Sequence, residues 1–204
     1  MSVALIDYGA GNLHSVHNAL VKAGANDVAV TADPDVVARA ERIVLPGVGA
    51  FRACRDGLYG LPGVVEAMSE AVGQRGVPFL GICVGMQLLA ETGEEFGSHA
   101  GLGWIAGTVR LIEPADATIK VPHMGWNDVT PATPHRLIEP GEAYYLHSYH
   151  FDAVDPAQIL ATTEHGGRLV SAVGRDTIVG VQFHPEKSQN YGLSFLSRFL
   201  EWKP

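Results

Sequence analysis

The chain has 204 residues, of which 47% are hydrophobic and 18% are charged, and its formal net charge is −8. A chain of this length and composition can bury a substantial core, and we expect a single domain over residues 1–204. The acidic balance and the lack of any cluster of Lys and Arg argue against nucleic acid or an anionic membrane as the main partner.

Cysteine usage and the N-terminal residues bear on the compartment. Cys54 and Cys83 are too few for a disulfide framework, and the nine histidines do not stand at zinc-ligand spacing with them. We therefore expect no metal ion, no cofactor and a reducing environment. The first residues resemble a strand rather than a signal peptide, and the longest apolar run, 77–90, is too short to cross a bilayer. These features favour a cytoplasmic protein.

Strand patterns alternate with helical patterns through the first half of the chain. Strands are expected at 2–7, 27–31, 42–45 and before Cys83, and helices at 13–22, after Pro34 and within 61–74. The alternation predicts an α/β fold, a three-layer α/β/α sandwich of the flavodoxin type. Its central sheet should be mostly parallel, with antiparallel strands added after about Gly107.

A glycine-rich turn follows the first strand. A dinucleotide-binding turn has a third glycine after the first two and an acidic residue at the end of the second strand. Here His14 stands at the third glycine position after Gly9 and Gly11, and no acidic residue clearly ends the second strand. We therefore interpret this segment as a tight strand-to-helix turn, in which Asn12 is placed to cap the helix.

Residues 77–90 carry a pattern typical of a nucleophile. An apolar run after Pro78 predicts a buried strand, Gly81 and Gly85 permit a sharp turn around Cys83, and residues 86–91 predict the start of a helix. Such an elbow presents a thiol at the end of a strand, and the helix N-terminus favours the thiolate. The alternative is a buried cysteine in an apolar strand, and the pattern alone does not decide between them.

The third strand ends in Pro46-Gly47-Val48-Gly49-Ala50-Phe51. The two glycines leave the peptide unit at Val48 free to turn either way. By itself this is an ordinary loop, but at the carboxyl edge of a parallel strand beside Cys83 it could supply an oxyanion donor. Cys54, in the helix expected to follow, is interpreted as a small core residue.

Short strands dominate the second half of the chain. They are expected at 108–112, around 122–127, and at 142–151, 159–164, 169–174 and 178–183, with an irregular loop at 93–103, a hairpin turn at Gly166-Gly167 and a last helix at 190–202. Met124 and Trp126 are either core plugs or an exposed contact surface, and the sequence slightly favours the core. The histidines of residues 142–151 are interpreted as structural or surface residues.

The segment His184-Pro185-Glu186 follows an apolar strand. Pro185 favours an extended conformation at His184, and residues two apart in an extended chain point to the same side. His184 and Glu186 are thus placed as a base and the carboxylate that orients it, as a cysteine nucleophile requires.

Together these motifs resemble the class I (triad) glutamine amidotransferases, from Ser2 to the last helix. The nucleophile pattern Gly-x-Cys-x-Gly-x-Gln matches Gly81, Cys83, Gly85 and Gln87, and His-Pro-Glu matches residues 184–186. Within that family the chain looks most like the glutaminase subunits of imidazole glycerol phosphate synthases. That resemblance rests on residues 7–12, 46–51, 122–127, 144–149 and 184–188, and Val84, where many members carry Leu, is a conservative departure.

The resemblance implies hydrolysis of L-glutamine to glutamate and ammonia. The ammonia would pass to a (β/α)8-barrel cyclase subunit, which forms a heterodimer with this chain and acts in histidine biosynthesis. It makes Cys83 the nucleophile, His184 the acid and base, and Glu186 the residue that orients His184. It also implies backbone oxyanion donors at Val84 and at Val48 or Gly49, and it places Gln87 and Ser148 on the glutamine-binding side.

The same resemblance places Asn12, Trp126 and Lys187 at the cyclase interface, where their alternative roles are a helix cap, a core aromatic and a solvated charge. Three other functions stay open. One is an amidotransferase subunit of pyridoxal phosphate, anthranilate or purine synthesis, and a second is a thiol peptidase or γ-glutamyl hydrolase on the same architecture. The third, a non-catalytic flavodoxin-like binding module, is disfavoured because it would have no use for the three triad residues together.

Overall fold

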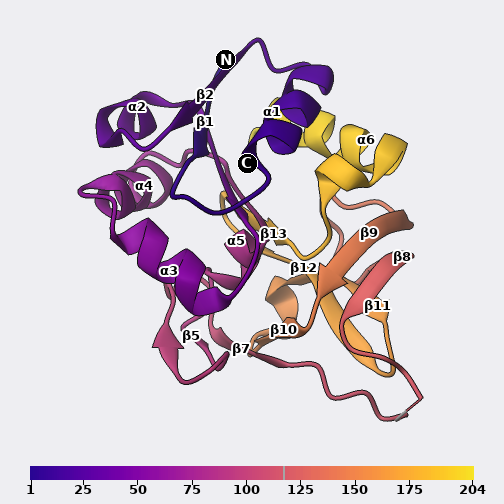
Figure 1. Ribbon diagram of the computed structural model, residues 1–204. Coiled ribbons are helices and arrows are strands. Elements are labelled where there is room, and N and C mark those ends of the chain that lie inside the picture. The colour runs from indigo at the N-terminus through magenta and orange to yellow at the C-terminus, as the bar shows by residue number, and fades with distance from the viewer. Residues whose placement is uncertain (117) are drawn as a thin grey trace.

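The computed structural model describes residues 1–116 and 118–204 of the chain (Figure 1). The first half runs β1 (Ser2–Ile6), α1 (Leu13–Lys22), β2 (Asp27–Thr31), α2 (Pro34–Arg39), β3 (Arg42–Gly47), α3 (Phe51–Tyr59), α4 (Val64–Gly73), β4 (Phe79–Cys83) and α5 (Val84–Gln87). The second half runs β5 (Thr92–Gly93), β6 (His99–Ala100), β7 (Gly107–Leu111), β8 (His123–Pro131), β9 (Gly141–His147), β10 (Tyr149–Ala153), η1 (Pro156–Gln158), β11 (Ile159–Glu164), β12 (Arg168–Arg175), β13 (Ile178–Val181), η2 (Pro185–Lys187) and α6 (Gln189–Glu201).

A nine-stranded mixed sheet forms the centre, in the order β2-β1-β3-β4-β13-β12-β11-β8-β9. The strands from β2 to β13 are parallel, and those from β13 to β9 are antiparallel. This confirms the predicted mostly parallel half with antiparallel additions. A second sheet, β10-β7-β5-β6, was not predicted.

Helices cover both faces of the parallel half (Figure 1). α2, α3 and α4 lie on one side of it, and α1 and α6 on the other, which gives the three expected layers. The central parallel strands are buried because both faces of the sheet are covered there: every residue of β3 and of β4 is buried. No helix of the described residues is both long and apolar enough to cross a membrane.

The structure corrects several local predictions. The elbow helix begins at Val84 and ends at Gln87, and the loop predicted at 93–103 includes the last residue of the short strand β5 and all of β6. The strand expected at 142–151 breaks at Ser148, so that β9 belongs to the large sheet and β10 to the small one. Two expectations are confirmed: the turn at Gly166-Gly167 joins the antiparallel strands β11 and β12, and Asn12 caps α1 by accepting from the N–H of Ser15 at 3.4 Å.

Strand register brings the predicted site together. Gly47 of β3 pairs with Cys83 of β4, and Val181 of β13 pairs with Ile82. Since the three strands are parallel neighbours, their carboxyl ends lie at one edge of the sheet, which is where α/β folds place their sites. Residues that follow β3, β4 and β13 therefore meet there although they are far apart in sequence.

Candidate active site

Cys83 ends β4, and the chain turns sharply there into α5. Its φ angle is +55°, a region that residues other than glycine rarely adopt. Both neighbouring glycines are needed: a Cβ on Gly81 would lie 2.5 Å from the carbonyl oxygen of Gly85, and a Cβ on Gly85 would collide with the carbonyl oxygen of Leu45. This strained, crowded turn has the geometry of the nucleophile elbow that the sequence predicted.

His184 lies just beyond β13 and is held from two directions. Its Nδ1 lies 2.9 Å from Oε1 of Glu186, which confirms that the two side chains are directed together. His184 itself is extended as predicted (φ −99°, ψ 99°), but the extended chain does not continue, because residues 185–187 form the single 3-10 turn η2 and the contact is made across this turn. The backbone N–H of His184 donates to the carbonyl of Tyr144 at 2.9 Å, and Ser188 Oγ donates to the carbonyl of His184 at 2.6 Å. These bonds tie the imidazole to β9.

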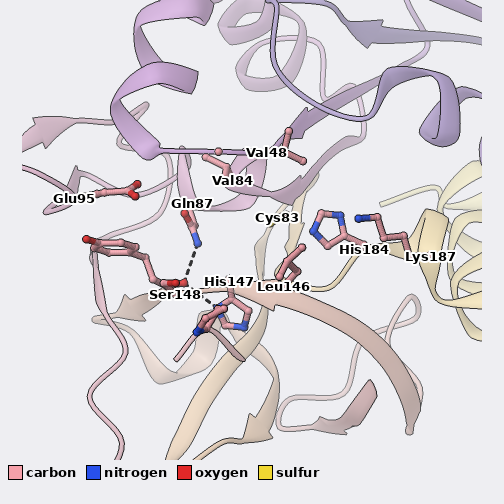
Figure 2. Close-up of a pocket in the computed structure, with 13 residues that line it drawn as sticks. Val48, Cys83, Val84, Gln87, Glu95, Leu146, His147, Ser148, His184 and Lys187 are labelled. Atoms are coloured by element: carbon pink, nitrogen blue, oxygen red, sulfur yellow. Dashed lines mark hydrogen bonds between the residues drawn. The ribbon is translucent and has the colours of Figure 1, made fainter. Parts of the chain in front are cut away.

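Cys83 and His184 are both buried, line the same cavity and lie close enough for the sulfur to affect the pKa of the imidazole (Figure 2). Burial lowers the pKa of His184, but its hydrogen bonds with Cys83 and Glu186 and the negative charges of both outweigh burial and raise the pKa to about 10. The imidazole is therefore protonated at neutral pH beside the sulfur. A cysteine paired with a protonated histidine in this way is suited to nucleophilic attack.

Two buried glutamines stand beside the sulfur. Gln182 Nε2 donates to Cys83 Sγ at 3.6 Å, and Gln182 Oε1 accepts from Gln87 Nε2 at 3.0 Å. The same nitrogen of Gln87 donates to the carbonyl of Tyr149 at 3.0 Å. The amide nitrogen of Gln87 is thus used within the protein, which leaves its carbonyl oxygen for a ligand. Sequence reasoning missed Gln182, whose one signal was a polar residue between the apolar strand and His184.

A cavity of about 290 Å³ opens over the sulfur (Figure 2). Of the residues singled out from the sequence, its lining includes Val48, Gly49, Cys83, Val84, Gln87, Ser148, His184 and Lys187. Glu186 stands behind His184 rather than in the cavity wall. The volume lies at the lower end of the range typical of small-molecule sites, so the cavity suits a compact ligand.

Glu95 is a cavity residue that sequence reasoning missed. It lies at the other end of the cavity from His184 (Figure 2), and its Oε2 accepts from the N–H of Phe51 at 2.6 Å at the start of α3. A carboxylate in this place can pair with an ammonium group on a ligand. Its neighbours Glu91 and Glu94 are also acidic, so the sequence offered no sign that this one faces the cavity.

The segment after β3 passes over the elbow. The carbonyl of Val48 accepts from Cys54 Sγ at 3.3 Å, and the carbonyl of Pro46 accepts from the hydroxyl of Tyr8 at 2.5 Å. In a trans peptide the carbonyl and the next N–H point in opposite directions, so the N–H of Gly49 points away from Cys54. Cys54 is buried in α3 as predicted, and it also holds one carbonyl of this segment.

Trp126 is not a core residue, which corrects the slight preference drawn from the sequence. Trp126 is 47% exposed and Met124 is 60% exposed, because both point outward from β8 while His123 points inward. The rings of Trp126 and Tyr144 pack edge to face, with 6.1 Å between their centres. The ammonium of Lys187 lies 5.8 Å from the centre of the Tyr144 ring. Trp126 and Met124, both exposed, and the half-buried Tyr144 and Lys187 form one apolar and cationic row beside the cavity, and Asn12 lies outside it.

A histidine cluster lies under β8 and β9. His123 Nδ1 is 3.0 Å from His147 Nε2, and the His123 ring stacks on Tyr145 and on His165 at 4.6 and 4.2 Å between ring centres. The structural role expected for His147 agrees with this packing, although the same residue also lines the cavity. Among residues 1–116 and 118–204, no group of three or more His, Cys, Asp or Glu side chains is arranged to hold a metal ion.

Comparisons with known proteins agree with this geometry. Solved structures with the same fold include a glutamine amidotransferase (TM-score 0.76, 16% identity, 98% of each chain) and the glutaminase domain of a Trypanosoma brucei CTPS with bound acivicin (TM-score 0.68, 18% identity, 100% of this chain and 95% of that chain). At these identities the likeness concerns the fold alone.

Sequence relatives are much closer. The chain is 60% identical to the imidazole glycerol phosphate synthase subunit HisH of Zymomonas mobilis, over 100% of this chain and 97% of the relative. It is 55% identical to the protein of the same name from Rhodospirillum rubrum, over all of both chains. The family glutamine amidotransferase class-I matches residues 4–201, and this chain, with its thiol on an elbow beside a buried His and Glu, belongs to that family.

Proposed function

We propose that this chain is the glutaminase subunit of an imidazole glycerol phosphate synthase. It would hydrolyse L-glutamine to glutamate and ammonia and pass the ammonia to a cyclase subunit in histidine biosynthesis. The observation that carries the proposal is that Cys83 and His184 line one cavity of about 290 Å³, with Nδ1 of His184 held by Oε1 of Glu186 at 2.9 Å. The names of the relatives described above support the synthase in particular.

The first half of the reaction forms a thioester. The Cys83 sulfur attacks the side-chain amide carbon of glutamine, and the carbonyl electrons move to the oxygen. When this tetrahedral intermediate collapses, the C–N bond breaks and the proton of His184 passes to the departing nitrogen, which leaves as ammonia. His184 is then neutral, and Glu186 keeps its Nδ1–H fixed so that Nε2 faces the reacting atoms.

The second half releases glutamate. Neutral His184 takes a proton from water, the water oxygen attacks the thioester carbon, and the C–S bond breaks to restore the sulfur anion and the protonated imidazole. Backbone N–H groups of Val84 and of Val48 or Gly49, which border the cavity above the sulfur, are the proposed donors to the oxyanion in both halves.

Opposite charges at the cavity support an amino acid as the substrate. Glu95 is placed to pair with the α-ammonium group of glutamine, and Gln87 and Ser148 line the wall between Glu95 and the sulfur. Lys187 lies beside His184, at the end where the ammonia is released (Figure 2).

The partner in this proposal is a (β/α)8-barrel cyclase that docks where the cavity opens. The row of exposed Met124 and Trp126 with the half-buried Lys187 supports this surface, since exposed aromatic and apolar groups beside a polar rim are typical of interfaces. Asn12 is assigned to the edge of the same interface. A cytoplasmic location is part of the proposal because the nucleophile must stay reduced.

Two assays on matched proteins test the proposal. Wild-type protein with its cyclase and nucleotide substrate should release glutamate from free glutamine and form imidazole glycerol phosphate. Cys83→Ser should abolish both glutamine-dependent products, yet the complex should still form imidazole glycerol phosphate from added ammonium salts. Loss of the ammonium-dependent reaction in a well-folded complex, or full glutamine turnover by Cys83→Ser, would contradict the assignment.

A further inference from the structure

A continuous chain of hydrogen bonds connects β8 with the sulfur of Cys83. Every link is between 2.9 and 3.0 Å except the last, which involves sulfur and is 3.6 Å long. In order, the members are Asn127, His123, His147, the carbonyl of Tyr149, Gln87, Gln182 and Cys83. Only the last member, Cys83, belongs to the catalytic triad.

The carbonyl of Tyr149 sets the direction of donation toward the sulfur. A main-chain carbonyl only accepts, so Gln87 must present its NH₂ group to it, and the second N–H of that group then points to Gln182 Oε1. With its oxygen facing Gln87, Gln182 has its NH₂ group on the side of Cys83 Sγ. The orientation of the Gln182 amide is therefore determined by its neighbours and does not depend on the sulfur.

The other end of the chain donates toward the same carbonyl. Asn127 Oδ1 accepts from the N–H of Asp128 at 2.8 Å, and its Nδ2 donates to the carbonyl of Glu164 at 2.8 Å. That orientation makes Asn127 a donor to His123 Nε2, so His123 donates from Nδ1 to His147 Nε2. His147 then donates from Nδ1 to the carbonyl of Tyr149 at 2.9 Å.

The chain requires both imidazoles to be neutral, and their surroundings ensure this. Burial, followed by the charge of His165, lowers the pKa of His123 to about 4, and burial lowers the pKa of His147 to about 3. Each ring therefore offers one donor and one acceptor at neutral pH. Buried polar chains in which every group is satisfied hold a single arrangement firmly.

We propose that Gln182 is a further catalytic residue, whose amide N–H donates to the Cys83 sulfur and holds it as the thiolate that attacks the substrate. Its side chain is fully buried, so water cannot replace it as the donor to that sulfur. Hydrogen bonds to a charged acceptor are stronger than those to a neutral one, so the contact favours the thiolate over the thiol. Gln87 and His147 are positioning residues for this amide.

The inference rests on Cys83 being the nucleophile, and alkylation of its sulfur tests it without glutamine. The rate of Cys83 carboxamidomethylation by iodoacetamide would be followed from pH 5 to 9 in the full chain, with the labelled peptide identified by mass spectrometry to separate it from Cys54. Gln182→Met removes the donor at similar volume and should move the pH midpoint of alkylation upward by about one unit. At a given pH below both midpoints, Gln182→Met would then be alkylated about tenfold more slowly than the wild type.

Gln182→Glu and Ser171→Ala complete the test. Glu places an acceptor oxygen where the donor was, so its midpoint should lie at least as high as that of Gln182→Met. Ser171 is a fully buried residue of the neighbouring strand β12 whose hydroxyl contacts Tyr145 at 2.6 Å, and Ser171→Ala should retain the wild-type midpoint. Circular dichroism and urea unfolding would verify folding of each variant. Equal midpoints for wild type and both Gln182 variants would overturn the inference, as would an equal shift in Ser171→Ala.

Discussion

Nδ1 of His184 lies 2.9 Å from Oε1 of Glu186, and the two side chains are only 3% and 2% exposed. Because the carboxylate occupies Nδ1, the other ring nitrogen, Nε2, is directed to Cys83. The contact thus sets both the tautomer of the imidazole and the charge that the imidazole can hold. Its removal should alter the rate and the pH dependence together.

Glu186→Gln should lower kcat for glutamine hydrolysis by about 10² to 10⁴, since an amide can hold the ring in place but cannot balance its positive charge. The pKa of His184 is raised to about 10 in part by this carboxylate, so its loss should lower that pKa. The protonated imidazole is lost as pH rises through its pKa. The alkaline limb of kcat should therefore move to lower pH in the variant, where that pKa is lower. Glutamate release between pH 6 and 10 measures both effects.

Glu142→Gln is a suitable control for this substitution, since Glu142 is an exposed residue of β9. It should leave rate and pH profile unchanged. An alkaline limb that stays at the wild-type pH in Glu186→Gln would show that the carboxylate does not set the charge of His184.

Gly49 has a φ angle of +96°, with nothing within 4 Å of the place where a Cβ would stand. Gly49→Ala therefore adds no clash, but it strains the backbone by about 1–2 kcal/mol and should shift the peptide that borders the cavity. We expect kcat to fall by about tenfold or more, and the free energy of unfolding to fall by no more than this strain of about 1–2 kcal/mol. Steady-state kinetics and urea unfolding check the two parts.

Gly24 provides the matched control, because its φ is +114° and its Cβ position is also empty, but it lies after α1, away from the cavity. Gly24→Ala carries the same backbone strain and should keep the wild-type kcat. Equal rates in both variants would mean that the conformation at Gly49 does not matter to the reaction.

The elbow and the His-Glu pair were predictable because each is written in one short segment. Gly81, Gly85 and Pro185 constrain the backbone locally, so the chemistry at Cys83 and His184 follows from residues close to them in sequence. The alternation of strands and helices likewise predicted the parallel half of the sheet.

What the sequence could not predict depends on which strands become neighbours. The break at Ser148 arises because β9 pairs with β8 while β10 pairs with β7 in another sheet, and no local pattern marks that change of partner. Gln182 contacts the sulfur only because β13 lies beside β4. Trp126 is exposed because β8 is covered on its inner face alone, and an aromatic residue in a strand suits either face.

Trp126→Ala should weaken binding of the cyclase subunit while leaving the fold intact. The side chain is 47% exposed and its ring packs edge to face with Tyr144 at the surface, so little internal packing is lost. Truncation of a central aromatic residue of an interface typically costs about 2 kcal/mol or more, which corresponds to a Kd raised roughly 30-fold. Titration calorimetry with the cyclase measures the change.

Val154→Ala is the control for the interface, since Val154 is 71% exposed but follows β10, on the other sheet. This variant should bind the cyclase with the wild-type Kd. If Trp126→Ala also binds normally, the row beside the cavity is not the docking surface.

The buried histidines predict a specific loss of stability in acid. Burial holds His123 and His147 neutral in the folded protein, with pKa values lowered to about 4 and about 3, whereas both take up protons near pH 6.5 once unfolded. A lowered pKa contributes stability that is present above the unfolded value and is lost as pH falls toward the folded one. The free energy of unfolding should therefore decline between pH 6.5 and about 4.

In His123→Gln this decline should be smaller by roughly 1–3 kcal/mol, as measured by urea unfolding at pH 7 and pH 4.5. His14→Gln, which changes an exposed histidine of α1, is the control, and a decline in His123→Gln as steep as that of wild type would show that the neutral imidazole is not the source.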